Sequence, residues 1–398
     1  MLRVLLITQN FSPEIGSAAN RLTKLYESLS NEDEIEVSVL TSNPRYPNKK
    51  LYEENPIFKQ KLDSQTSIEC ISPFFKKYHK NYILRLIFYL EFLVKGYFKG
   101  KKLAQNTDVV VASTPNFFSG ILGVLLKKKK LILDVRDLWP KSVEGVKKNK
   151  TTYFHKMIYK IAYKAEKWMY QSADHIVINS EGFLSHLLAL GINEEKITFI
   201  PNPITLEELE KGGSHLEKNK ETTTTKVVYA GNVGRAQEMQ PLIKLIDAYK
   251  NSSEHTFTII PYGVDTESFI QQIKKINASN VKILKPQPRE IVFDYLANAT
   301  IGYVGLIDIE EFRDVIPGKI IDYFGSGTAV IANLEGYSQK IIQQSSGGIT
   351  MEDSSNVHKL MVNRKMQYEL AKNGLIFAKK HYSWDKNYQR FLKIIKGI

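Results

Sequence analysis

The sequence predicts an α/β protein with two parallel sheets, one in each half of the chain. First, 43% of the residues are apolar and 24% are charged, which is typical of soluble globular proteins. The length of 398 residues is sufficient for two or three domains. Second, short runs of β-branched residues alternate with segments of helical periodicity, the pattern of βαβ units. Third, a polar stretch at Leu206–Lys226 separates two such series and is the predicted linker.

The first series carries six predicted strands and three predicted helices. Strands are expected at Arg3–Thr8, Glu36–Thr41, Val109–Ser113, Leu131–Val135, His175–Asn179 and Ile197–Pro201. Helices are expected at Ala18–Ser30, Tyr82–Ala104 and Tyr153–Ala173. The first apolar run, Val4–Ile7, is too short for a signal peptide and is expected to form a buried strand.

The second series repeats the pattern after the predicted linker. Strands are expected at Lys226–Ala230, Thr256–Pro261, Val281–Leu284, Thr300–Gly305 and Ala329–Asn333. Helices are expected at Met239–Asn251, Asp265–Asn277, Arg289–Ala297, Lys319–Phe324 and Val357–His381. Open α/β sheets bind ligands outside the carboxyl ends of their strands, so the predicted site is the cleft between the two domains.

Cysteine content and hydropathy favour a cytosolic protein. The single cysteine, Cys70, cannot form an intramolecular disulfide or a thiolate zinc site alone. The most apolar stretch, Tyr82–Phe98, is interrupted by Arg85, Glu91 and Lys95, so no transmembrane helix is predicted.

The segment 74–102 is strongly basic and aromatic. It contains eight Lys or Arg, one Glu and nine aromatic residues, a net charge of +7 out of +13. This pattern predicts a helix that binds an anionic membrane surface, and the alternative is a solvated helix that packs on the first domain. No nucleic-acid motif accompanies the charge, so no nucleic-acid partner is expected. The predicted membrane residues are Lys76, Lys77, Lys80, Lys99, Lys101 and Lys102.

Two loops that follow predicted strands carry small residues suited to phosphate. Gly16 and Ser17 precede the first helix, whose N-terminal N–H groups favour an anion; the alternative is an ordinary strand-to-helix turn. Gly231, Asn232 and Gly234, followed by Arg235, form a predicted diphosphate cradle. Neither G-x-G-x-x-G nor G-x-x-x-x-G-K-[ST] occurs, so dinucleotide-binding and P-loop interpretations lose support.

Carboxylates mark two further candidate segments. Asp314 and Asp322 frame Pro317-Gly318-Lys319-Ile320 at a predicted helix start, where Asp322 is placed to accept hydrogen bonds from sugar or ribose hydroxyls; the alternative is a capped helix with a first-turn acid. Asp134–Pro140 follows another strand and places Asp137 at the predicted cleft, with a structural Arg136–Asp137 ion pair as the alternative.

These segments, in this order, resemble glycosyltransferase family 4, the retaining nucleotide-sugar transferases of the GT-B fold. The resemblance covers nearly the whole chain and includes further stretches at Phe11–Gly16, Asn20-Arg21, Ile200–Pro203 and Phe324–Thr328. The stretch Asp137–Ser142 is most similar to the branch that transfers N-acetyl-fucosamine and related aminosugars in bacterial O-antigen and capsule synthesis.

The resemblance implies two Rossmann-like domains that face each other across a cleft. The N-terminal, acceptor-side domain is expected at 1–205 and the nucleotide-sugar domain at 206–380. A terminal helix, 381–398, is expected to cross back to the first domain.

The resemblance also implies a role for each site residue. Arg235 and Lys319 would neutralise the diphosphate leaving group, Asp322 would bind the ribose and Asp314 the sugar. The family has Glu at both acidic positions and a Lys shortly after the Arg, where this chain has Gln237 and Glu238. In the first domain, Gly16 and Ser17 would approach phosphate and acceptor, and Asp137 would lie near the reacting sugar. No metal, no cofactor and no protein nucleophile are expected.

The expected function is therefore transfer of a sugar, an N-acetylated aminosugar, from a UDP-linked donor to a polyprenyl-diphosphate-linked saccharide. The enzyme would be cytoplasmic and peripheral on the inner face of the cell membrane. Two alternatives remain at this stage. A nucleotide-sugar 2-epimerase shares the architecture, and the two Glu-to-Asp departures leave room for a catalytically silent scaffold of the polysaccharide machinery.

Overall fold

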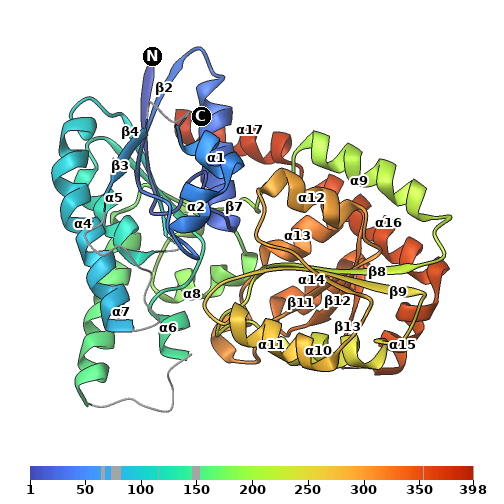
Figure 1. Cartoon of the computed structure of the whole chain (residues 1–398). Helices are drawn as coiled ribbons and strands as arrows, with labels where there is room; N and C mark the ends of the chain where they lie inside the picture. Colours follow the sequence, from blue (N-terminus) through green and yellow to red (C-terminus); the bar gives the residue numbers. More distant parts are fainter. Residues whose placement is uncertain (64–67, 73–81, 115, 146–152, 353, 398) are drawn as a thin grey trace. The chain divides into compact units, whose positions relative to one another are not determined.

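The computed structural model describes residues 1–63, 68–72, 82–114, 116–145, 153–352 and 354–397. The chain forms two compact units. The N-terminal unit comprises Met1–Pro201 and Asn387–Ile398, and the C-terminal unit comprises Asn202–Lys386. Each unit contains a parallel sheet flanked by helices (Figure 1), which confirms the predicted α/β class and matches the two Rossmann-like domains of the GT-B fold.

The sheet of the N-terminal unit has the order β3-β2-β1-β4-β5-β6-β7, and all its pairings are parallel. Its strands are β1 (Leu2–Ile7), β2 (Ile35–Ser42), β3 (Ile68–Ile71), β4 (Val109–Ser113), β5 (Lys130–Val135), β6 (His175–Ile178) and β7 (Ile197–Phe199). The six predicted strands occur within about two residues of their predicted ends. Strand β3 was not predicted from the sequence; its four residues include the charged Glu69.

Helices cover both faces of this sheet, with α4, α5 and α7 on one face and α1 and α2 on the other (Figure 1). Their bounds are α1 (Ser17–Ser30), α2 (Lys50–Glu54), α3 (Pro56–Asp63), α4 (Tyr82–Ala104), α5 (Phe117–Leu126), α6 (Lys141–Gly145), α7 (Tyr153–Ser172) and α8 (Leu184–Ala189). The last helix, α17 (Trp384–Lys396), belongs to this unit from Asn387 onward. Its Tyr388 hydroxyl donates to the Ser28 carbonyl oxygen of α1 over 3.0 Å.

The sheet of the C-terminal unit has the order β10-β9-β8-β11-β12-β13 and is also parallel. Its strands are β8 (Thr225–Asn232), β9 (His255–Tyr262), β10 (Val281–Ile283), β11 (Ile301–Gly305), β12 (Ala329–Asn333) and β13 (Gly348–Thr350). Its helices are α9 (Leu206–Asn219), α10 (Gln240–Ala248), α11 (Thr266–Ile276), α12 (Arg289–Ala297), α13 (Gly318–Gly325), α14 (Tyr337–Ser345), α15 (Ser354–Val362) and α16 (Arg364–His381).

The predicted linker at Leu206–Lys226 is wrong, because most of it forms helix α9. Thr205 caps this helix: its hydroxyl accepts from the backbone N–H of Glu208, whose carboxylate accepts in return from the Thr205 N–H. Gly212 lies inside this helix. A larger residue would not fit there, because a Cβ would come within 2.2 Å of the Gly325 carbonyl oxygen. This glycine, interpreted as a linker signal, marks a close backbone approach.

The single helix predicted at Val357–His381 is also wrong, because two helices occupy this stretch. The first, α15, ends at Val362, and the side chain of Asn363 accepts from the Met366 N–H to cap α16. An asparagine at this position therefore begins a new helix instead of continuing the old one.

Candidate nucleotide-sugar site

The predicted donor residues of the C-terminal unit follow the two central strands of its sheet. Strand β8 pairs with β9 on one side and β11 on the other, so the direction of winding reverses between β8 and β11. Ligands of open α/β sheets bind at such a switch point, outside the carboxyl ends of the strands. Gly231 and Asn232 are the last residues of β8, and Gly234 and Arg235 follow it. The segment from Asp314 to Lys319 lies between β11 and β12.

The loop after β8 is held in shape by its own side chains. Gly231 has φ 142°, a conformation that favours glycine. The Gln237 side-chain oxygen accepts from the Asn232 side-chain nitrogen (2.9 Å) and from the Gly234 N–H (3.0 Å). Gln237 stands where the family resemblance expects a lysine, and here it closes the loop. Arg235 is exposed at the end of this loop.

Lys319 lies directly against the loop after β8. A Cβ at Gly231 would come within 2.5 Å of Lys319 Cε and 2.8 Å of its Nζ, so the end of the lysine side chain lies directly against this glycine. The ammonium also lies 5.1 Å from the centre of the Tyr229 ring, a cation–π distance. Burial lowers the pKa of Lys319 to about 8, and the nearby Asp322 opposes that shift. The structure thus brings together two predicted elements, the glycine loop and the lysine.

Asp322, one turn into α13, is part of a partly buried charge network that was not predicted from the sequence. Its carboxylate pairs with Arg289 of α12 at 2.9 Å, and Arg289 pairs in turn with Glu208 of α9 at 2.8 Å. Burial raises the pKa of the Asp322 carboxyl, and the Arg289 charge opposes that rise. Arg289 had no signal in the sequence, because 33 residues separate it from Asp322. The carboxylate predicted to bind ribose is therefore already oriented by a neighbouring guanidinium.

The remaining predicted donor residues lie in and around the start of α13. Pro317 is the N-cap, Gly318 opens the helix, and the Pro317 carbonyl oxygen accepts from the Ile320 N–H over 3.0 Å. Ile320 is buried in the core. Asp314 is half-buried in the segment that precedes the helix.

The other predicted site residues belong to the N-terminal unit, where two loops meet. Arg136, after β5, donates from Nη2 to the Ser17 hydroxyl at the start of α1 (2.8 Å). Gly16 is the N-cap of α1, with φ 131°. Burial raises the pKa of Asp137 to about 6, against opposing hydrogen bonds from the Ser142 side chain and the Leu138 backbone. The structure thus joins Ser17 to the segment that carries Asp137.

Glu14 is a buried acid in the same region to which the sequence analysis gave no role. Its carboxylate accepts from the Arg45 N–H (2.9 Å) and from the Asn10 side chain. Burial raises its pKa to about 7, against these hydrogen bonds. A carboxyl with a pKa near 7 in the loop between β1 and α1 is a candidate proton donor or acceptor. In the sequence, the only indication of this role was a single acidic residue among small and apolar neighbours.

Asp134 has a structural role. It is fully buried and pairs with Arg21 of α1 at 2.8 Å, while the Ser113 hydroxyl donates to its other oxygen over 2.9 Å. Arg21 also donates to the Pro201 carbonyl oxygen. This ion pair fixes α1 against the sheet and thereby positions Gly16 and Ser17.

The six predicted membrane lysines fall into two groups. Lys76, Lys77 and Lys80 lie outside the described residues. Lys99, Lys101 and Lys102 are exposed on α4, and Lys99 donates to the Cys70 carbonyl oxygen (3.0 Å) and approaches Glu69 (3.4 Å). In the described part of the chain, no helix is long and apolar enough to span a bilayer. The same residues contain no cluster of three or more His, Cys, Asp or Glu that would suit a metal ion.

Comparisons with known proteins agree with this geometry. Residues 18–208 match the family model of Glycosyltransferase Family 4. No curated protein sequence matches the chain.

Several solved structures share the fold of the whole chain at low sequence identity. Sucrose-phosphate synthase from Thermosynechococcus elongatus has a TM-score of 0.72 at 15% identity, covering 100% of this chain and 99% of its own. The Anabaena protein Alr3699/HepE in complex with UDP-glucose has a TM-score of 0.69 at 11% identity, with 100% of both chains covered. WaaG, a glycosyltransferase involved in lipopolysaccharide biosynthesis, has a TM-score of 0.65 at 13% identity, covering 99% of this chain and 100% of its own. The family match and the GT-B fold together support a glycosyltransferase.

Proposed function

We propose that the chain is a retaining glycosyltransferase that moves a sugar from a UDP-linked donor to a lipid-linked saccharide acceptor in surface polysaccharide synthesis. The observation that carries the donor side is the placement of Lys319 against the Gly231 loop, at the switch point of the second sheet. A UDP-glucose complex of similar fold supports a UDP-linked donor. Within the proposal, the sugar is an N-acetylated aminosugar, as the Asp137–Ser142 stretch suggests.

The reaction breaks the bond between the anomeric carbon and the β-phosphate oxygen. Positive charge develops on the sugar and negative charge on the departing diphosphate. Lys319, Arg235 and the N–H groups at the start of α13 are the donors proposed to stabilise the leaving group. Losing one preorganised donor of this kind costs roughly 2.7–4 kcal/mol of transition-state stabilisation.

In this proposal the anomeric configuration of the sugar is retained, because the acceptor hydroxyl attacks the same face of the sugar that the diphosphate leaves. The acceptor hydroxyl oxygen bonds to the anomeric carbon, and its proton passes to a leaving phosphate oxygen. UDP and the extended saccharide are the products. No protein nucleophile and no metal are assigned. Asp322 binds the ribose through the carboxylate oriented by Arg289, and Asp314 contacts the sugar.

A donor panel tests the proposal. The chain is incubated with membrane extract and each of several UDP-sugars, and released UDP and sugar in the organic phase are both measured. A transferase gives equal amounts of UDP and lipid-borne sugar with at least one donor. An epimerase instead yields an isomerised nucleotide-sugar without net UDP release, and a silent scaffold changes no donor. Either of those two outcomes contradicts the proposal.

A further inference from the structure

The two strands at the switch point of the second sheet are held by different neighbours at their carboxyl ends. The last pair that joins β8 to β11 in the described sheet is Val228–Gly302. Beyond it, β8 stays paired with β9 as far as Asn232, and β11 stays paired with β12 as far as Gly305. The segment called the Arg235 loop below, residues 233–239, follows β8 directly after this separation.

Two backbone hydrogen bonds join the Arg235 loop to the end of β11. The Glu238 N–H donates to the Gly305 carbonyl oxygen over 3.3 Å, and the Ile307 N–H donates to the Ala236 carbonyl oxygen over 3.0 Å. One bond is donated from each side, so the pair, called the backbone bridge below, fixes the two segments against each other. Because Ala236 directly follows Arg235, the position of the arginine depends on this bridge.

The side chain of Tyr303 adds a third hydrogen bond to the backbone bridge. Tyr303 lies on β11, is fully buried, and donates its hydroxyl to the Glu238 carbonyl oxygen over 2.6 Å. Burial raises the pKa of this phenol further above its ordinary value, so the hydroxyl keeps its proton and remains a donor near neutral pH. Glu238 is therefore held at its N–H by Gly305 and at its carbonyl by Tyr303.

Gly305 lies directly against the bond between Tyr303 and Glu238. A Cβ at position 305 would overlap with both the Tyr303 hydroxyl oxygen and the Glu238 carbonyl oxygen. One of these two atoms belongs to the backbone, so a side chain at position 305 would have to displace the loop itself. A glycine at the end of β11 therefore leaves room for the hydrogen bond that holds the loop.

The buried tyrosines connect both cations that are proposed to neutralise the leaving group. The Tyr229 ring lies 6.2 Å from the Tyr303 ring and 5.1 Å from the Lys319 ammonium. The Tyr229 hydroxyl donates to the Asn232 carbonyl oxygen, at the last residue of β8. Lys319 therefore contacts one tyrosine of this layer, and the loop that carries Arg235 is bonded to the next.

We propose that Tyr303 is a positioning residue for the proposed sugar transfer, because it holds Arg235 in place through Glu238. The effect on turnover rests on the proposed function, whereas the hydrogen bond to the loop belongs to the free protein. Tyr303 is buried within the unit, so it acts through the loop and not by contact with substrate. A tyrosine that served only the core would lower stability when truncated but would not be coupled to Arg235.

Hydrogen exchange of the full chain without ligand tests the link between Tyr303 and the loop. Tyr303→Phe removes the hydroxyl and keeps the buried ring. Exchange measured by mass spectrometry should become about tenfold faster in peptides that cover residues 233–239 and 305–309, because local opening is opposed by one hydrogen bond fewer. Peptides from β9 and β12 should keep their wild-type rates. Equal acceleration throughout the C-terminal unit would show that the hydroxyl only stabilises the core, and would overturn the proposal.

A double-mutant cycle on turnover tests the link to Arg235. With saturating donor, Tyr303→Phe should lower kcat about tenfold in the wild-type background and by less than about twofold in the Arg235→Ala background. The loss should be the same at pH 7 and pH 9, because the buried hydroxyl does not titrate in this range, whereas Lys319 does. Equal losses in both backgrounds would show that Tyr303 does not act through Arg235.

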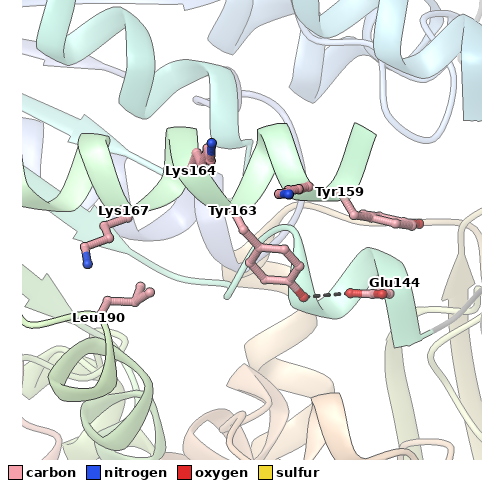
Figure 2. Close-up of a pocket in the computed structure, with 7 residues that line it drawn as sticks. Glu144, Tyr159, Tyr163, Lys164, Lys167 and Leu190 are labelled. Carbon is pink, nitrogen blue, oxygen red and sulfur yellow. Dashed lines mark hydrogen bonds between the residues drawn. The ribbon is translucent and has the colours of Figure 1, made fainter. Parts of the chain in front are cut away.

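Tyr163 of the N-terminal unit provides the control for loss of a tyrosine hydroxyl. It points from α7 toward Glu144 of α6 beside an open pocket of about 510 Å³, and its hydroxyl donates to that carboxylate over 2.7 Å (Figure 2). Neither residue belongs to the Arg235 loop or to β11. Tyr163→Phe should therefore change kcat by the same factor with and without Arg235, and it should leave exchange in residues 233–239 unchanged.

Gly305→Ala reaches the backbone bridge by a second route. The added methyl group would separate the Tyr303 hydroxyl from the Glu238 carbonyl, so exchange should accelerate in the same two peptides. Unchanged exchange in both Tyr303→Phe and Gly305→Ala would overturn the proposal. Accelerated exchange without transfer from any donor would remove the proposed function and leave the bond between Tyr303 and the loop standing. Transfer that does not respond to Tyr303→Phe would overturn the inference and leave the proposed function standing.

Discussion

Lys319 gives the proposed donor site a pH dependence. Burial places its pKa at about 8, so the ammonium is mostly protonated at pH 7 and loses its proton as the pH rises through 8. UDP affinity should therefore fall by about tenfold between pH 7 and pH 9. Lys319→Arg should flatten this profile, because a guanidinium stays charged throughout that range. Calorimetric titration of UDP at several pH values measures the profiles of the wild type and of Lys319→Arg. A wild-type UDP affinity that does not change with pH would show that Lys319 does not contact the diphosphate.

Arg235 is expected to act in the transition state. It is exposed at the end of the Gly231 loop, so Arg235→Ala should leave folding unchanged. Turnover should fall by about 100- to 1,000-fold if its charge stabilises the departing diphosphate. Lys244→Ala, which removes an exposed cation from α10 of the same unit, is the control and should keep wild-type kcat. An Arg235→Ala protein with wild-type kcat would exclude this residue from the mechanism.

Asp322 has two roles that mutation can separate. Asp322→Asn should weaken UDP binding roughly tenfold or more, because a hydrogen bond to a charged group contributes about 1.5–3 kcal/mol. The same change disturbs the ion pair with Arg289. Glu208→Gln disturbs the other ion pair of Arg289 and leaves the Asp322 carboxylate in place. Calorimetry with UDP should therefore show a loss in Asp322→Asn that Glu208→Gln does not reproduce; equal losses would make Asp322 a purely structural acid.

At the scale of single elements, α9 anchors the back of the predicted donor site. It supplies Glu208 to the charge network and passes close to α13 at Gly212. Gly212→Ala should destabilise the protein by about 1–3 kcal/mol, because the new methyl group would meet the Gly325 carbonyl oxygen.

The neighbouring glycine of α9 provides the control. A Cβ at Gly213 would have its nearest neighbour 3.8 Å away, so Gly213→Ala should stabilise by about 0.5–1 kcal/mol through helix propensity. Unfolding by urea measures both changes. Equal effects of the two alanines would show that the contact between α9 and α13 does not constrain position 212.

Local patterns in the sequence predicted elements well where burial and periodicity agree. The predicted bounds Val109–Ser113, Arg289–Ala297 and Ala329–Asn333 match the structure. The two strands among them are apolar and buried almost throughout, so burial and sequence pattern agree there. Helix α9 was mistaken for a linker because its glycines serve a close packing contact that only the fold reveals. The sequence also did not indicate which side of an apolar helix is exposed. On α4, for example, Phe98 is exposed and Phe92 is buried.

At the scale of the whole molecule, site residues were predictable where a local motif contains them, whereas contacts between residues distant in the chain were not. Gly231 and Lys319 were found through separate local motifs, and the sheet order then explains their contact. The link between Asp322, Arg289 and Glu208 joins three helices, and no local pattern encodes it. Glu14 was visible as a residue, but its raised pKa depends on burial by the surrounding fold.

The central claim is that the switch point of the second sheet binds the nucleotide of a sugar donor. The most direct measurement is a crystal structure of the chain with UDP. The account predicts the diphosphate within hydrogen-bonding distance of Lys319 Nζ and the backbone N–H groups of the Gly231–Arg235 loop, with the ribose hydroxyls at Asp322. UDP bound at any other place, or a site that stays empty at saturating UDP, would contradict it.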